Sequence, residues 1–345
     1  MIPKNNIIKS LEMISSLPEQ PIHALFNYHK EYPISKELKN INFRIDNKKY
    51  DKIYSSLKLK FINKNNIIAL TRKSALGDVI ASTSVIKALK KKNIGKKIYF
   101  YTSPSAAPLL INNKDIDAIF FHKNLKSNFN WKNVNYENGN PKISIFDRMI
   151  QSVGLDIFGE DPILYIDDDE KDWARNWRKS VCKDKNKLVG IHAGFTMPGK
   201  YWPQHKWFKL VEWLKENKYS VIEFGSVGGY DSCIGLSAHG LPLRMVMSMI
   251  YQCDIIICID SMMMHMANAL KKKCISLFGS TDPKVYTPSH VSAYPISSDS
   301  AFSKFHNDGK NNRWFTPCLN EEMENCMDSI EVKDVIDKFL KVLEL

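Results

Sequence analysis

From about residue 66 onward, short apolar runs alternate with stretches whose apolar residues recur at helical spacing. Runs of this kind predict buried strands, and the intervening stretches predict amphipathic helices. Strands that alternate with helices are typical of a parallel, doubly wound α/β sheet. We expect strands at 67–74, 96–103, 117–122, 163–167, 188–194, 220–226, 253–259 and 274–279, and helices at 79–92, 105–113, 143–155, 173–181, 203–218, 241–252, 262–270 and 332–345.

The alternation restarts after the acidic stretch near residues 167–172, which predicts two domains. We place the first Rossmann-like domain at 67–170 and the second at 171–330, with a final helix at 331–345 that we expect to cross back to the first domain. The Asn-, Lys- and Gly-rich residues 123–142 are expected to form a loop.

Residues 1–66 have weaker patterns: helical spacing near 6–16 and 22–29, then an alternating stretch that is typical of a hairpin. No candidate chemistry occurs in this N-terminal extension. It is either a docking appendage or an added layer on the first domain.

Half of the net charge of +12 lies in this extension, because residues 1–66 carry twelve Lys and Arg against six Asp and Glu. A basic surface attracts nucleic acid, anionic lipid or phosphorylated substrates. No Arg-rich run or nucleic-acid motif accompanies the charge, so we expect no nucleic-acid partner. The alternative is that these lysines are simply solvated.

The chain has 345 residues, of which 44% are apolar, and no apolar run approaches the roughly 20 residues that cross a bilayer. The N-terminus lacks the apolar stretch of a signal peptide. We therefore expect a cytoplasmic protein.

Seven cysteines form no Cys-x-x-Cys pair. Cys253, Cys258 and Cys274 lie in or beside apolar runs, where a thiol packs as a small hydrophobe. Cys318 and Cys326 flank an acidic loop, and these two could pair or bind a metal.

The stretch 253–283 gathers polar groups after two neighbouring strands. Asp260 and Ser261 end one apolar run, and Thr281 follows the next. Ligands bind at the carboxyl ends of the strands in open α/β sheets, so an anion site is expected here. His265, on the first turns of the helix between the strands, is either a half-buried core histidine or a ligand contact.

A second candidate is the turn of Ser74, Gly77 and Asp78 between the first strand and its helix. Glycine permits a tight turn, and an aspartate at a helix N-terminus is most often a cap. A third candidate follows the strand at 188–192, where His192 and Gly194 precede Lys200.

Together these motifs resemble glycosyltransferase family 9, the heptosyltransferases of lipopolysaccharide core assembly. Four motifs carry the resemblance, in order along the chain: Ser74-Ala75-Leu76-Gly77-Asp78-Val79, His192-Ala193-Gly194 with Lys200-Tyr201-Trp202-Pro203, Asp260-Ser261-Met262-Met263-Met264-His265, and Phe278-Gly279-Ser280-Thr281-Asp282-Pro283. The resemblance covers roughly residues 66–340.

The resemblance implies a GT-B fold, in which two Rossmann-like domains face a cleft, and an inverting transfer that needs no metal or other cofactor. Asp78 would be the base that takes the proton of the acceptor hydroxyl, and Lys200 would stabilise the leaving diphosphate. The implied donor is a nucleotide-sugar such as ADP-heptose. The implied donor-binding residues are His192, Gly194, Lys200, Asp260, Ser261, Met262, His265 and Thr281, and Ser74 and Gly77 form the acceptor-side loop.

Met262 is the clearest departure, because the family has glycine at that position and a glycine lets the backbone approach phosphate closely. Donor identity and affinity are therefore open. The resemblance does not carry over the acceptor. We expect a surface-glycan precursor, either a glycan or a glycolipid, and the basic excess suits an enzyme that works at the anionic inner-membrane face. Two alternatives are an enzyme that transfers heptose to protein, and a non-catalytic binding or scaffold protein on the same frame.

Overall fold

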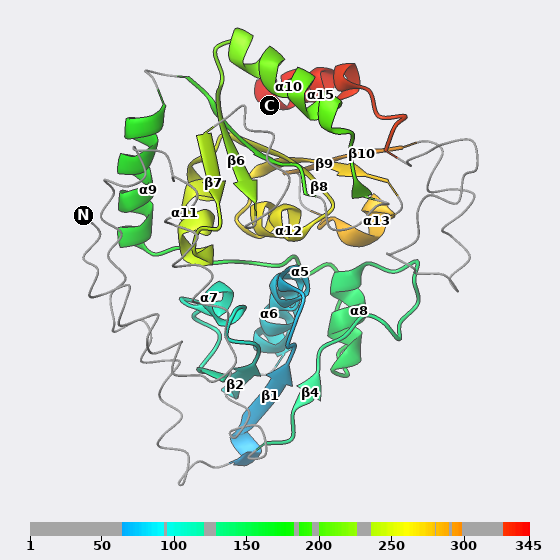
Figure 1. Cartoon of the computed structure of the whole chain (residues 1–345). Helices are drawn as coiled ribbons and strands as arrows, with labels where there is room; N and C mark the ends of the chain where they lie inside the picture. The colour runs from blue at the N-terminus through cyan, green and yellow to red at the C-terminus, as the bar shows by residue number, and fades with distance from the viewer. Residues whose placement is uncertain are drawn as a thin grey trace.

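The computed structural model describes residues 64–92, 95–120, 129–182, 186–194, 200–225, 236–279, 281–289, 292–298 and 327–345. It has two parallel sheets, one above the other in Figure 1, with helices packed between them. The doubly wound α/β fold predicted from the alternating pattern is confirmed. The N-terminal extension, apart from the turn η3 (Lys64–Asn66), lies outside the described residues.

The first sheet has the strand order β3-β2-β1-β4, and every neighbouring pair in it is parallel. Leu70 on β1 and Phe100 on β2 are fully buried, as expected for strands covered on both faces. The edge strand β4 lies in the stretch predicted as a loop. The strands are β1 (Ile67–Thr71), β2 (Lys97–Tyr101), β3 (Ala118–Phe120) and β4 (Lys132–Asn133).

The helix predicted at 79–92 is instead two helices, α5 (Leu76–Ala81) and α6 (Thr83–Lys92). The hydroxyls of Ser82, Thr83 and Ser84 each donate to the carbonyl three residues back, at 2.7, 2.7 and 2.8 Å. Such bonds compete with the helical ladder and bend it, which accounts for the break. The other helices of this half are α7 (Ala107–Leu110) and α8 (Ile145–Ser152).

The strand expected at 163–167 does not form. This segment runs between the sheets, where the Leu164 amide donates to the Ala269 carbonyl at 3.1 Å. Helix α9 (Asp168–Val181) begins five residues before the predicted start, because Asp167 and Glu170 form a capping box. The boundary expected at 170/171 therefore lies inside a helix.

The second sheet has the order β10-β9-β8-β5-β6-β7 and is also parallel throughout. Its strands are β5 (Leu188–His192), β6 (Ser220–Gly225), β7 (Leu236–His239), β8 (Ile255–Ile259), β9 (Lys273–Phe278) and β10 (Ala293–Ser297). The edge strands β7 and β10 were not predicted. The helices of this half are α10 (Gln204–Glu216), α11 (Leu243–Gln252), α12 (Met262–Ala269), α13 (Pro283–Tyr286) and α15 (Val332–Glu344).

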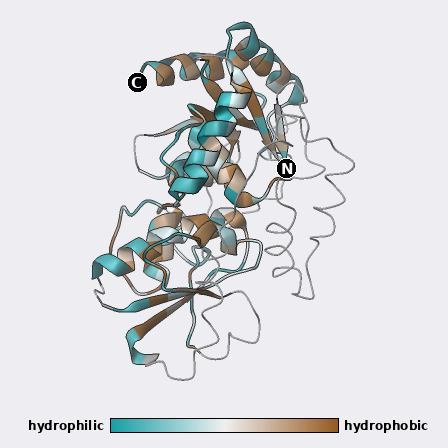
Figure 2. Cartoon of the chain, turned by 90° about the vertical axis from the view of Figure 1, so that its left-hand side faces the viewer, coloured by the Kyte–Doolittle hydropathy of each residue, from teal (hydrophilic) through white to brown (hydrophobic). Residues whose placement is uncertain are grey.

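The expectation that the final helix crosses back to the first domain is wrong. Helix α15 lies beside α10 over the second sheet (Figure 1). Its buried Phe339 has its ring centroid 5.0 Å from that of Tyr219 and 6.1 Å from that of Trp213. Hydrophobic and hydrophilic residues alternate along α15 (Figure 2). The apolar side of this helix, with Val335, Phe339 and Val342, is buried in the core of the second half.

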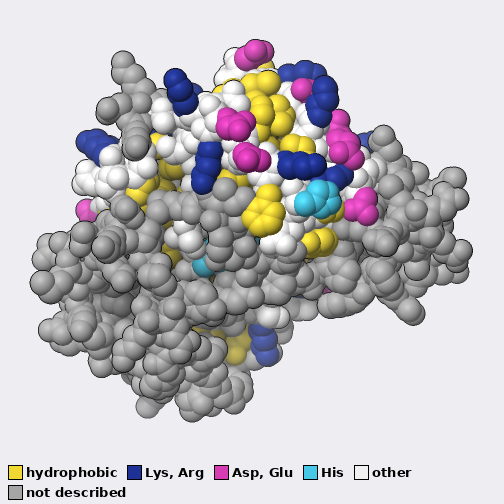
Figure 3. All heavy atoms as spheres, turned by 45° about the horizontal axis from the view of Figure 1, so that its top comes forward, with side chains coloured by type: hydrophobic (Ala, Val, Ile, Leu, Met, Phe, Trp, Pro, Cys, Tyr) yellow, Lys and Arg dark blue, Asp and Glu magenta, His cyan; other side chains and the backbone are white. Residues whose placement is uncertain are grey.

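The outer face above α10 and α15 has basic and acidic side chains interspersed around hydrophobic ones (Figure 3). Among the residues described on this face, positive charge does not gather into a single patch.

The two halves meet through their helices: α12 packs on α5, α11 on α7 and α13 on α8. Buried Arg244 of α11 donates to Glu170 Oε1 at 2.8 Å and to the Tyr165 carbonyl at 2.9 Å. It also reaches the carbonyls of Pro108 and Ile111 in the first half, at 3.3 and 3.4 Å. No helix in the described residues is long and apolar enough to span a membrane.

Candidate active site

Asp78 lies in the first turn of α5, directly after the loop that leaves β1. The N-cap position is Ala75, with φ of 52°, and no side chain caps this helix. The reading of Asp78 as a cap is therefore wrong. Its carboxylate instead forms an ion pair with Arg72, and its side chain is only 13% exposed.

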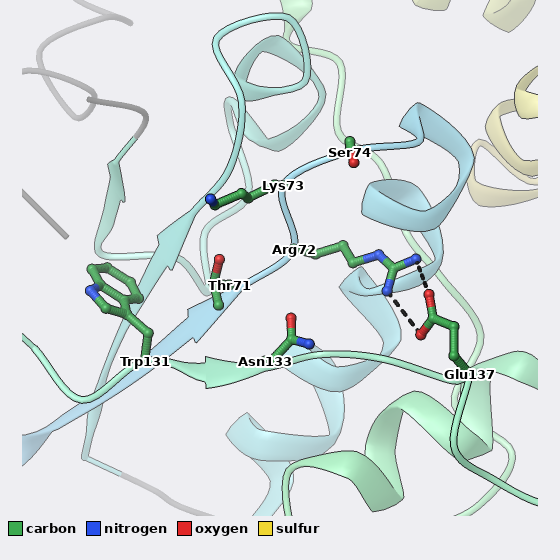
Figure 4. Close-up of a pocket in the computed structure, with 7 residues that line it drawn as sticks. All are labelled: Thr71, Arg72, Lys73, Ser74, Trp131, Asn133 and Glu137. Atoms are coloured by element: carbon green, nitrogen blue, oxygen red, sulfur yellow. Dashed lines mark hydrogen bonds and ion pairs between the residues drawn. The ribbon is translucent and has the colours of Figure 1, made fainter. Parts of the chain in front are cut away.

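Arg72 is shared between two carboxylates. Its Nη2 contacts both Asp78 Oδ2 and Glu137 Oε1, the latter at 2.7 Å, and its Nη1 lies 3.1 Å from Glu137 Oε2. Figure 4 shows the guanidinium facing both oxygens of Glu137. The hydroxyl of Tyr136 donates to Asp78 Oδ1 at 3.5 Å. Asp78 thus has a cation on one oxygen and a phenol on the other.

The pKa of the Asp78 carboxyl is raised above its usual value, chiefly because burial disfavours the charged form. The charge of Arg72 opposes this rise, and the charge of Glu137 adds to it. Glu137 itself has a lowered pKa, because its hydrogen bonds with Arg72 outweigh its partial burial. Asp78 is therefore more basic than an ordinary aspartate, as a proton acceptor in a transfer reaction should be.

On the second half, Lys200 and Asp260 form a buried pair. Lys200 Nζ lies 2.6 Å from Asp260 Oδ2, and the hydroxyl of Thr281 donates to the same oxygen at 2.6 Å. Their side chains are 9% and 2% exposed, so Lys200 is not an ordinary surface lysine. Burial alone would raise the pKa of Asp260, but Lys200 outweighs it and the pKa is lowered.

Ser261 and Met262 begin α12. Ser261 is the N-cap, and its hydroxyl accepts from the Met263 amide at 3.3 Å. Met262 is the first helical residue and is not among the described residues with positive φ. The family's glycine is therefore not needed here for backbone conformation. Met263, Met264 and Met266 are buried in the core.

His265 of α12 is buried and close to the acceptor-side loop. Burial lowers its pKa to about 4, so the imidazole is neutral near pH 7. A Cβ on Gly77 would lie 2.9 Å from Cδ2 of His265. The glycine thus permits the first turn of α5, which carries Asp78, to touch α12.

Tyr286 and Arg148 connect the two sides. The ring of Tyr286, on α13, has its centroid 6.0 Å from Lys200 Nζ, and its hydroxyl is hydrogen-bonded to Arg148. Arg148 lies 5.3 Å from the ring centroid of Tyr136 and donates to the Tyr136 carbonyl at 3.0 Å. A continuous set of contacts therefore runs from Asp78 to Lys200.

His192 and Gly194 lie at the end of β5, next to β8. His192 Nδ1 is 2.8 Å from the Phe224 carbonyl, and burial lowers its pKa. Gly194 has φ of 58°, and a Cβ there would lie 2.3 Å from Cδ1 of Ile259.

Buried Glu223 lies at the carboxyl end of β6, 3.8 Å from His239 Nε2.

Sequence reasoning missed Arg72, Tyr136, Glu137, Arg148 and Tyr286. Arg72 and Tyr286 lie within a few residues of recognised motifs, so an extended motif search could have found them. Tyr136 and Glu137 lie in the predicted loop, and Arg148 lies in the helix predicted at 143–155. The sequence gives no indication of the tertiary neighbours of these three residues.

A cavity of about 480 Å³ lies at the carboxyl end of β1 (Figure 4), and one of its lining residues is Arg72, the ion-pair partner of Asp78. The indole of Trp131 forms one wall, and Glu137 with Arg72 lies opposite. Its lining residues are Thr71, Arg72, Lys73, Ser74, Trp131, Asn133 and Glu137. Such a mixture of an aromatic face with polar groups suits a sugar or another polar small molecule.

Among the described residues, no group of three or more His, Cys, Asp or Glu side chains could hold a metal. Cys253, Cys258 and Cys274 are buried free thiols, as predicted, and the Sγ atoms of Cys258 and Cys274 are 3.7 Å apart. Cys318 and Cys326 lie outside the described residues, so their predicted pairing or metal binding stays a prediction.

Known proteins resemble this chain both in sequence and in structure. Residues 146–314 match the model of glycosyltransferase family 9 (heptosyltransferase). Lipooligosaccharide heptosyltransferase 2 of Haemophilus influenzae is 32% identical over 127 residues, and that of Haemophilus ducreyi is 30% identical over 132 residues. These alignments span 32% and 33% of this chain, and only 36% and 38% of the two relatives.

Solved structures share the fold at lower identity. The family 9 glycosyltransferase of Veillonella parvula has a TM-score of 0.66 at 15% identity, covering 82% of this chain and 99% of that one. Escherichia coli ADP-heptose lps heptosyltransferase II has a TM-score of 0.63 at 16% identity, covering 80% and 98%. The dodecameric iron-containing heptosyltransferase TibC, in complex with ADP-D-beta-D-heptose, has a TM-score of 0.62 at 14% identity, covering 81% and 76%. The expected GT-B fold is confirmed, whereas metal independence stays an expectation.

Proposed function

The chain is a relative of glycosyltransferase family 9 in motifs and in fold, and on that premise we propose that it transfers a sugar from a nucleotide-diphospho-sugar to a glycan or glycolipid acceptor. One observation carries the proposal. Asp78, from the first half, and the buried Lys200–Asp260 pair of the second half are joined by a series of contacts through Tyr136, Arg148 and Tyr286.

In the proposed step, the acceptor hydroxyl attacks the anomeric carbon as Asp78 takes its proton. A new C–O bond forms, and the bond to the diphosphate oxygen breaks on the opposite face, which inverts the anomeric centre. The raised pKa of Asp78 suits this role, because a stronger base receives the proton more readily.

The diphosphate receives the electron pair of the broken bond and gains negative charge. Lys200 is the proposed cation for it, sharing its ammonium between Asp260 and a phosphate oxygen. The amides at the start of α12 add the positive end of a helix dipole. Thr281 keeps Asp260 oriented by donating to it. His192 and Gly194 lie on the neighbouring strand end and complete the proposed donor side.

The cavity at the carboxyl end of β1 is the proposed acceptor site. Trp131 offers an apolar face for a sugar ring, while Asn133 and Ser74 offer hydrogen bonds to its hydroxyls. Lys73 adds a positive charge at the edge. The net charge of +12 supports an acceptor at an anionic membrane surface, which vesicle flotation with and without anionic lipid would test.

A donor screen tests the proposal. Wild-type protein is heated with a panel of nucleoside diphosphates and nucleotide-sugars, and the best donor is then assayed with lipid, glycan and protein acceptors. We expect stabilisation by one nucleotide class, with ADP-heptose the first candidate. Absence of stabilisation and of transfer with every nucleotide would overturn the proposal and favour a binding or scaffold protein.

The Asp78→Asn variant tests the base. It removes the proton acceptor but keeps the shape, so transfer should fall by at least about 100-fold while nucleotide binding stays within about threefold. Asp168→Asn is the control, because that side chain is 93% exposed on α9. Full transfer by Asp78→Asn would reject the assignment of the base.

A further inference from the structure

Arg72 holds Glu137 with two hydrogen bonds but Asp78 with only one of its nitrogens. The two contacts with Glu137, at 2.7 and 3.1 Å, match the planar fork of the guanidinium to both oxygens of one carboxylate. Nη1 also donates to the Val134 carbonyl at 3.3 Å. The orientation of the guanidinium is therefore set by the segment 134–137 and not by Asp78.

Removing either Glu137 or Arg72 would change the basicity of Asp78. Without Glu137, Arg72 would be free to turn and pair with both oxygens of Asp78. A carboxylate held by a bidentate arginine is a weaker base. Without Arg72, Asp78 would be a buried carboxylate close to the negative charge of Glu137 and would hold its proton.

Arg72 and Glu137 are the charged groups that contact Asp78 directly or through each other, because the other titratable groups around it are neutral or face elsewhere. Tyr136 and Tyr286 are phenols whose pKa values are raised, so both are neutral near pH 7. His265, reached through Gly77, is also neutral. Arg148 faces Tyr136 and Tyr286.

Resting on the proposed function, we propose that Glu137 is a positioning residue that sets the strength of the base by keeping Arg72 in a bidentate pair, so that Asp78 stays ionised yet able to accept a proton. Glu137 touches neither reacting atom in this role; it acts through Arg72.

The charge balance of the reaction supports the same role. When the acceptor proton moves to Asp78, that carboxyl becomes neutral and Arg72 loses one counter-charge. Glu137 remains paired with Arg72, so the guanidinium, whose side chain is 12% exposed, is not left uncompensated. The electron pair of the broken C–O bond goes to the diphosphate, outside this cluster.

The test measures the pKa of the Asp78 carboxyl directly, by carbon-13 NMR titration of the full chain, with the signal assigned by its loss in Asp78→Asn. We expect Glu137→Gln to lower this pKa and Arg72→Met to raise it. Glu216→Gln, at an exposed position on α10, is the control and should leave it unchanged. A merely structural role would not move the pKa in opposite directions.

The pH at which the transfer rate falls on the acid side should shift as the Asp78 pKa does, downward in Glu137→Gln and upward in Arg72→Met. Above both pKa values, Glu137→Gln should lower kcat by about three- to tenfold with little change in donor KM, because a weaker base takes the proton less readily. If Arg72→Met does not fold, Glu137→Gln alone decides, since Glu137 is half exposed. An Asp78 pKa that stays the same or rises in Glu137→Gln would overturn the inference.

Failure of this inference and failure of the proposed function are distinguishable. If the Asp78 pKa falls in Glu137→Gln and rises in Arg72→Met but wild-type protein transfers no sugar, the positioning role stands and the function is wrong. If wild-type protein transfers sugar but the Asp78 pKa does not fall in Glu137→Gln, only the role of Glu137 is wrong.

Discussion

Gly77 and His265 touch across the two halves of the molecule, at a distance that leaves no room for a side chain on Gly77. A Cβ at this position would lie 2.9 Å from Cδ2 of His265 and 3.6 Å from the Cα of Met262. The neighbour of Gly77 is the proposed base. A change at Gly77 should therefore affect both the packing of the halves and the placement of Asp78.

We expect Gly77→Ala to displace the loop or His265, lowering the free energy of unfolding by about 1–3 kcal/mol as overpacking does elsewhere. Transfer should fall by about tenfold or more, because catalysis depends closely on geometry. The double variant Gly77→Ala with His265→Ala relieves the contact, so its loss should be smaller than the sum of the two single losses. Additive losses in urea unfolding would contradict the proposed clash.

The buried His265 should make stability depend on pH. In the unfolded chain its pKa is near 6.5, and in the folded chain it is about 4. Between these values the unfolded chain binds a proton that the folded chain does not, so stability falls as pH drops from 6.5 towards 4. A shift of this size corresponds to roughly 3 kcal/mol.

The variant His265→Gln isolates this contribution. Its free energy of unfolding should fall less steeply than that of wild-type protein between pH 6.5 and 4, as followed by urea unfolding at several pH values. Parallel curves for the two proteins would show that His265 is not held neutral.

The Lys200–Asp260 pair should be costly to break from one side. Lys200→Met leaves a buried carboxylate without its cation, which typically costs about 3–5 kcal/mol. Lys333→Met removes a cation from an exposed pair with Asp337 on α15 and should leave the free energy of unfolding almost unchanged, because solvent screens exposed pairs. Similar losses in the two variants would mean that solvent reaches Lys200 and Asp260 freely.

Trp131 should affect the acceptor and not the donor. Trp131→Ala removes the aromatic wall of the cavity, so the acceptor KM should rise by about tenfold while nucleotide affinity stays within about twofold. Trp131→Phe keeps an aromatic face and should recover most of the loss. A raised donor KM with an unchanged acceptor KM would move the acceptor away from this cavity.

The alternating pattern was sufficient for the fold, because buried parallel strands and amphipathic helices have distinct periodicities. It failed where local bonds or short pairings decided the structure. The hydroxyls of Ser82, Thr83 and Ser84 interrupt one helix, and the short edge strand β4 lies in a stretch without apolar alternation. The final helix could not be placed from its own sequence, because its apolar side would suit either sheet.

For the candidate site, the motifs identified residues on both sides of it, including Asp78, Lys200, Asp260 and His265. The motifs did not indicate which charged residues form ion pairs with one another. Lys200 is held by Asp260, 60 positions further on, and Arg72 is held by Glu137, 65 positions further on. Such partners depend on tertiary contacts that no local spacing encodes.

Arg244 sets a constraint on movement between the halves. Its bonds to Glu170, the Tyr165 carbonyl and the carbonyls of Pro108 and Ile111 join three segments of the chain at one buried guanidinium. Sliding the halves past each other would break several of these bonds at once and leave a buried guanidinium without partners, which is costly. Arg244 is thus one buried point at which the two halves of the molecule are held together.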